Sequence, residues 1–183
     1  MNPRCAAFLV MLVAVSVIAA AETASAGPPA GPEHVRLTAM CGTWDVEMTF
    51  RFQPAGPGVT TKGTSTIRSL FDGLFIEEKI EGVLNGAAFT TLAWTGFNTA
   101  THQYEATRIA STNTIRIAET GGYDENTKRF ELKADYPFAG DTWHQRTVIQ
   151  QMSPDAMIAT SYLSFGKAPE WQGVEIKYTR TAK

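Results

Sequence analysis

Cysteine is scarce in this sequence: Cys5 and Cys41 are its two examples among 183 residues. Small extracellular domains that depend on disulfides carry several cysteine pairs, so a disulfide framework is excluded. Histidine and cysteine do not occur at the spacing of a zinc site, and we expect no metal and no other cofactor. The folded part of the chain must therefore take its stability from a hydrophobic core.

Charge of one sign is not concentrated anywhere along the chain. The 16 Lys and Arg residues and 18 Asp and Glu residues give a formal net charge of −2, and no basic block occurs. Nucleic acids and anionic membrane surfaces attract clustered positive charge. Both are therefore poor candidates as partners, and the oligomeric state has no signature in the sequence.

Familiar catalytic motifs are missing too. The sequence has no Gly-x-Ser-x-Gly nucleophile elbow and no glycine-rich loop of the kind that binds phosphate. The pair Gly121-Gly122 is interpreted as a hairpin turn. Motifs therefore predict no catalytic residues.

A long hydrophobic run occurs once, at the N-terminus. Arg4 precedes an uncharged apolar stretch from Cys5 to Ala21, and Ala24-Ser25-Ala26 supplies the small-x-small pattern that signal peptidase recognises. The alternative is a retained membrane anchor, but a spanning helix needs about 20 apolar residues and the run barely reaches that length. We therefore expect residues 1–26 to be a secretory signal peptide cleaved after Ala26, and the mature protein to be secreted or periplasmic.

The rest of the chain is expected to form one domain. Residues 27–32 are a spacer rich in proline and glycine, and residues 33–183 are predicted to fold. A short helix is predicted from Glu33 to Met40, because Pro32 precedes it and Gly42 follows its end.

Beyond this helix, apolar residues recur with a period of two, which is typical of half-buried strands. On the first strand the apolar face consists of Trp44, Val46, Met48, Phe50 and Phe52. Further strands are predicted between turn residues at 63–71, 75–84, 88–97, 103–111, 114–120, 128–136, 142–152, 156–165 and 173–181. Short strands at hairpin spacing favour an all-β fold, a single antiparallel up-and-down β-barrel of about ten strands, with a sandwich as the alternative.

Two residues far apart in the chain are expected to meet where such a barrel closes. Arg180 shares a face of the last strand with Tyr178, and an inward-facing charge needs a partner because burying it alone is costly. In a closed barrel the first and last strands are neighbours. Arg180 should therefore lie over Trp44 and beside Gly42, as a structural closure of the barrel.

This pair of features resembles the calycin superfamily of lipocalin-like barrels, in which an arginine of the last strand covers a Gly-x-Trp of the first. From about Leu37 to Arg180, the chain is similar to a bacterial family described as domain of unknown function 1579. The matching features are Leu37 with Gly42-Thr43-Trp44, Gly63 with Ser69 to Gly73 and Phe75, and Tyr178-Thr179-Arg180. Gly96-Phe97-Asn98 departs from the Gly-Tyr-Asp that such proteins often carry. The resemblance implies a fold and no activity.

The inward positions of this barrel decide what it can bind. The candidate ligand-binding residues are Trp44, Met48, Phe50, Ile76, Glu78, Ile80, Phe130, Leu132 and Tyr178. Because most of them are apolar, our leading hypothesis is an exported barrel that binds a small lipophilic or amphipathic molecule. The alternative is that these side chains fill the interior, which leaves a solid barrel that acts through its surface.

An enzyme of the isomerase or hydrolase kind is a further alternative, with Glu78 or His144 acting inside the same cavity. Glu78 lies on an apolar strand face, where it could be a general base or form a structural ion pair. Its possible ion-pair partners are Arg68, Arg108 and Arg146. A haem-binding barrel is also conceivable if His144 faces inward as the axial ligand.

Overall fold

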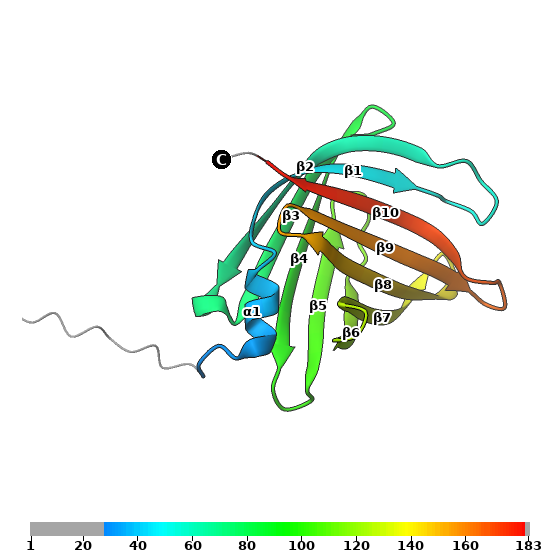
Figure 1. The fold of residues 1–183 in the computed structure, drawn as a ribbon. Coiled ribbons are helices and arrows are strands. Elements are labelled where there is room, and N and C mark those ends of the chain that lie inside the picture. Colours follow the sequence, from blue (N-terminus) through cyan, green and yellow to red (C-terminus); the bar gives the residue numbers. More distant parts are fainter. Residues whose placement is uncertain (1–27, 182–183) are drawn as a thin grey trace, which may run out of the picture.

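The strands of this chain close into a barrel. The computed structural model describes residues 28–181, in which ten antiparallel strands pair in sequence order and β1 pairs with β10 (Figure 1). The elements are α1 (Pro32–Thr38), β1 (Gly42–Phe50), β2 (Val59–Leu70), the 3₁₀ turn η1 (Phe71–Gly73), β3 (Phe75–Leu84), β4 (Ala87–Asn98), β5 (Gln103–Ala110), β6 (Ile117–Asp124), β7 (Arg129–Phe138), β8 (Asp141–Ser153), β9 (Ala156–Phe165) and β10 (Trp171–Arg180). The predicted up-and-down barrel with a short N-terminal helix is confirmed, and the sandwich is excluded.

The predicted hairpin turn at Gly121-Gly122 is wrong. Both residues lie inside β6, where Gly121 pairs with Leu132 and Gly122 pairs with Glu131. A Cβ atom at Gly121 would collide with the backbone carbonyl of Glu131, so the glycine permits a close approach of two strands. The turn comes after Asp124, whose carboxylate accepts backbone hydrogen bonds from the two residues that follow Glu125.

Phe52 also differs from its predicted place on the inner face of the first strand. The last pair of the β1–β2 ladder is Phe50 with Val59, so Phe52 lies beyond the strand and its alternation no longer applies. Phe52 is 64% exposed and its ring stacks on that of Phe50, with the centroids 6.3 Å apart.

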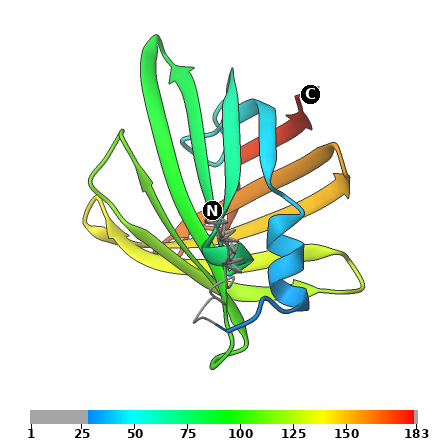
Figure 2. The same ribbon diagram turned by 90° about the vertical axis from the view of Figure 1, so that its left-hand side faces the viewer.

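The helix α1 lies against β3 and β4 and covers one end of the barrel (Figures 1 and 2). It begins at Pro32, the position where a missing backbone N–H costs nothing. His34 Nδ1 accepts a hydrogen bond from the Gly31 amide at 3.0 Å. Two contacts attach the helix to the barrel. The side chain of Leu37 is fully buried between the helix and the barrel, and the hydroxyl of Tyr104 on β5 donates to the Glu33 carbonyl at 3.1 Å. This end of the barrel is therefore sealed by side chains of the helix.

Arg180 joins the two ends of the chain at this sealed end. Its guanidinium carbon lies 4.1 Å from the ring centroid of Trp44, and the two residues pair across β1 and β10. Arg180 also donates to the carbonyls of Cys41 at 2.8 Å and Pro154 at 2.9 Å. Gly42 has a φ of +145°, and a Cβ atom there would collide with Arg180 Nη1. The arginine thus holds together the strand after α1, the β8–β9 turn and β10.

The predicted signal peptide, residues 1–26, lies outside the described residues. Within residues 28–181, no helix has the length and apolar character needed to cross a membrane.

Replacing Arg180 by alanine should lower the free energy of unfolding by about 2 kcal/mol or more, because charge-assisted hydrogen bonds and the cation–π contact are lost together. Lys177→Ala, on the outer face of the same strand, is the control and should stay within about 0.5 kcal/mol. Urea unfolding of Arg180→Ala, Trp44→Phe and the double variant should show non-additive effects. Strictly additive effects would contradict a direct contribution of the contact.

Candidate functional site

The barrel is not packed solid. Its interior holds a cavity of about 270 Å³, and an apolar cavity of roughly 150 Å³ already accommodates benzene. Every predicted interior residue except Trp44 lines this cavity: Met48, Phe50, Ile76, Glu78, Ile80, Phe130, Leu132 and Tyr178. Trp44 is fully buried at the helix end of the barrel, outside the cavity lining. Its ring lies edge-on to that of Tyr178, and its Nε1–H donates to the Met40 carbonyl. Its role is therefore in the sealed end and not in the cavity wall.

A second hollow of about 310 Å³ adjoins the cavity at the end away from α1. We call it the mouth; its aromatic wall consists of Phe50, Phe52, Tyr136, Phe138, Trp143 and Trp171. Phe50 and Tyr136 line both the mouth and the cavity, so the two spaces are neighbours. Trp171 is fixed by a hydrogen bond from its Nε1–H to the Arg51 carbonyl at 3.1 Å. Exposed aromatic side chains such as Phe52 and Phe138 therefore border the open end.

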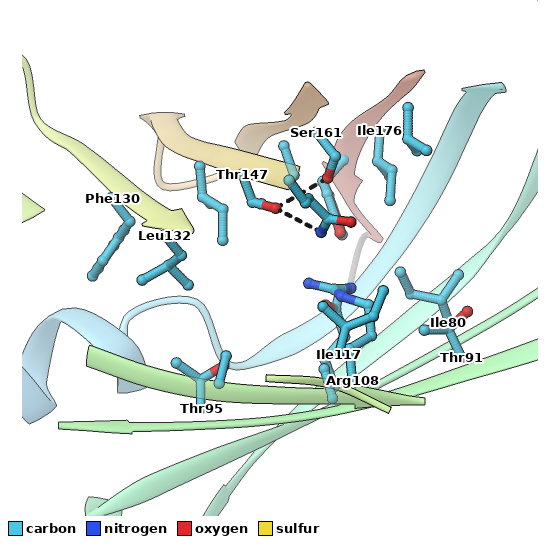
Figure 3. A pocket seen from close by; sticks show the side chains of 18 of the residues that line it. Ile80, Thr91, Thr95, Arg108, Ile117, Phe130, Leu132, Thr147, Ser161 and Ile176 are labelled. Atoms are coloured by element: carbon cyan, nitrogen blue, oxygen red, sulfur yellow. Dashed lines mark hydrogen bonds between the residues drawn. The ribbon is translucent and has the colours of Figure 1, made fainter. Parts of the chain in front are cut away.

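A polar cluster interrupts the apolar interior. Glu119 of β6 is 1% exposed, and its Oε1 accepts hydrogen bonds from Thr147 Oγ1 at 2.6 Å and Gln145 Nε2 at 3.1 Å. Its Oε2 lies 3.7 Å from Arg108 Nη2 and has no hydrogen-bond partner among residues 28–181. Figure 3 shows Arg108 extending from one wall of the cavity toward Thr147 and Ser161 on the other. The buried carboxylate is thus compensated by an arginine that faces the cavity.

Glu78 is held differently. Its Oε1 accepts a hydrogen bond from Ser65 Oγ at 2.8 Å, and its side chain lines the cavity. Two of the three predicted ion-pair partners are on the outer surface: Arg68 pairs with Glu77, and Arg146 with Glu170. The third, Arg108, pairs at close range with Glu119 instead. Glu78 therefore presents a carboxylate to the cavity without a close ion pair among residues 28–181.

The charges of the cluster shift the pKa values of their neighbours. Burial alone would lower the pKa of Arg108, but the negative charges of Glu119 and Glu78 outweigh it and raise that pKa. Burial, followed by the charge of Glu78, raises the pKa of Tyr178 well above its ordinary value. Burial also raises the pKa of Tyr136, whose hydroxyl donates to Gln145 Oε1 at 3.2 Å. At neutral pH, both phenols are uncharged hydrogen-bonding groups.

The alternative in which His144 faces inward is wrong. Its ring lies on the outer surface, where Nδ1 is 2.7 Å from Asp135 Oδ1 and half of the side chain is exposed. Alternation along β8 directs its neighbour Gln145 inward instead. His34 is part of α1 and His102 lies in a turn, so no histidine among residues 28–181 lines the cavity. The haem hypothesis loses its axial ligand, and residues 28–181 contain no group of three metal-ligating side chains.

The Arg108–Glu119 pair and its hydrogen-bond partners were not predicted from the sequence. Arg108 shares a strand face with Tyr104 and Ala106, which is the signal that could have placed it inside. Glu119 gave no such signal, because β6 carries two glycines and few apolar residues.

A closed antiparallel barrel with a helix at one end and a hollow interior defines a calycin-like protein. The family model described as "Protein of unknown function (DUF1579)" matches residues 29–180, and the chain belongs to that family. Among solved structures, the chain is similar to the S-type phycobiliprotein lyase CPES from Guillardia theta, with a TM-score of 0.54 and 10% identity. The match covers 84% of this chain and 99% of the lyase, and at this identity it is a likeness of fold. No curated protein matches.

The buried phenols predict a loss of stability at alkaline pH. Tyr136 and Tyr178 have raised pKa values in the folded state, so between about pH 10, where unfolded tyrosine ionises, and their higher native pKa, only the folded state keeps these protons. The free energy of unfolding should therefore be insensitive to these groups below about pH 10 and fall as the pH rises further. Urea unfolding between neutral and strongly alkaline pH checks this, and Tyr178→Phe should show a shallower fall. An equally steep fall in that variant would contradict the assignment.

Proposed function

We propose that this chain is an exported binding protein that holds one small, largely apolar or amphipathic molecule inside its barrel. The observation that supports this most directly is the interior cavity of about 270 Å³, with mostly apolar walls and a few polar groups. Apolar walls supply affinity through the removal of ligand surface from water, and a small number of polar groups orient the ligand.

The two ends of the barrel favour entry of the ligand through the mouth. Leu37 and Met40 form part of the cavity wall at the helix end, where both are buried, and Trp44 lies behind them. At the other end, the aromatic side chains of Phe52 and Phe138 are substantially exposed. Exposed apolar groups beside a pocket are typical of binding sites.

Catalysis is the second candidate function, and the site favours it less. Of the two alternative catalytic residues, Glu78 lines the cavity and His144 lies on the outer surface.

Binding can be tested with N-phenyl-1-naphthylamine, an uncharged dye that fluoresces in apolar surroundings. We expect one dye per chain. Ala159→Phe should weaken binding by about tenfold or more because Ala159 lines the cavity and a larger side chain would fill it. Thr160→Phe is the matched control, since alternation along β9 directs that residue to the other face. Equal binding by both variants would contradict an interior site, provided that both remain folded.

Export is proposed from the N-terminal pattern of residues 1–26. The mature protein recovered from the periplasm or the medium should begin at Gly27, which N-terminal sequencing can show. Ala26→Glu should leave an uncleaved precursor because the cleavage site needs a small residue there. A product that keeps Met1 and remains in the membrane fraction would overturn the proposal.

A further inference from the structure

The barrel interior carries an uneven set of charges. Two carboxylates and one guanidinium lie at the cavity wall. Glu78 and Arg108 line the cavity, and Glu119 lies behind the wall beside Arg108. The other residues that line the cavity, including Tyr136 and Tyr178, have side chains that are uncharged at neutral pH. The ionised interior therefore has one more negative charge than positive charges.

Arg108 has donors to spare on the side of the cavity. Its nearest charged partner is Glu119 at 3.7 Å, which is too long for a good hydrogen bond. Apart from this contact with Glu119, none of the five N–H donors of the guanidinium has a hydrogen-bond partner among residues 28–181. Its nitrogens are also absent from the buried polar atoms that lack a partner, so the guanidinium is open to the cavity.

Glu78 has acceptor capacity to spare. Within the described part of the chain, the carboxylate accepts a hydrogen bond from Ser65, and the Tyr178 hydroxyl is its second hydrogen-bonding neighbour. A carboxylate has about four lone-pair sites, so a ligand can approach the remaining ones from the cavity.

Arg108, the donor, and Glu78, the acceptor, lie at the same level of the sheet on strands that are separated by β4. Glu78 of β3 pairs with Ala93 of β4, and Ala93 pairs in turn with Arg108 of β5. Two strand spacings put the Glu78 and Arg108 backbones roughly 10 Å apart. The side chain between them is the single methyl group of Ala93, which leaves room for a ligand group.

We propose that the ligand carries an uncharged amide-like group, such as a carboxamide or lactam, that binds in this gap. Its carbonyl oxygen accepts from Arg108 and its N–H donates to Glu78. A carboxylate ligand would add a negative charge to an interior that already has an excess of one. An ammonium ligand would leave the donors of Arg108 facing a like charge. This inference rests on the proposed binding function and specifies the chemistry of the bound molecule.

Four probes with the same ten-carbon chain can test the head group: decanamide, decanoate, decylammonium and methyl decanoate. Each is titrated against the wild-type protein loaded with N-phenyl-1-naphthylamine. Decanamide should displace the dye at a concentration about tenfold or more below that of the other three, because a charge a few ångströms away changes such equilibria by that factor. An equal or better result for any of the other three would overturn the amide inference and leave the binding function standing.

Two variants locate the effect. Glu78→Gln removes one negative charge and should improve binding of decanoate by about tenfold or more, whereas Glu81→Gln, on the outer face of β3, should not change it. Ala93→Leu should fill the gap and remove the preference for decanamide while dye still binds. Equal effects of Glu78→Gln and Glu81→Gln would overturn the assigned gap.

The remaining outcomes also decide the matter. Dye binding that none of the four probes displaces would overturn the amide inference alone. Failure of the folded wild-type protein to bind either the dye or any probe would overturn the binding function together with the inference.

Discussion

The architecture depends on closure between β1 and β10, and closure depends on Arg180. The other strand pairs join segments that follow one another in the chain, so a short turn brings each pair together. The closing pair joins segments 139 residues apart, between Cys41 and Arg180. A single guanidinium covers the Trp44 ring and binds carbonyls from two distant turns, which compensates a charge that would otherwise be costly to bury. The cavity lies next to this closed end, and the buried residues Leu37 and Met40 form part of its wall.

The interior combines two requirements that oppose each other. A hollow core forgoes packing energy, and a buried carboxylate such as Glu119 needs compensation. Thr147, Gln145 and Arg108 supply that compensation from two other strands, so the polar cluster links walls that the cavity separates. Arg108 meets this structural need with one side of its guanidinium and keeps the other toward the cavity. The same residue can therefore support the barrel and orient a ligand.

Alternation in the sequence was sufficient for the barrel and for most of its lining, because each inward face is apolar over several residues, as with Trp44, Val46 and Met48. It failed where that pattern is weak. His144 was open to either face because β8 has polar residues on both sides, and the structure directs Gln145 and Thr147 inward. Gly121 was interpreted as part of a turn because the reason for a glycine there is the close approach of Glu131 on β7. The residues around Gly121 in the sequence do not indicate that contact. The Arg108–Glu119 pair depends on the register of β5 and β6, which local periodicity does not encode.

A barrel whose strands all have two neighbours offers no open sheet edge. Unpaired backbone N–H and C=O groups at an edge are a template on which another chain can add a strand, and such edges promote aggregation. Separation of β1 from β10 would create two edges at once, each nine or ten residues long and with an apolar face. Because Arg180 binds groups on both sides of the β1–β10 seam, it also keeps these two edges paired and covered.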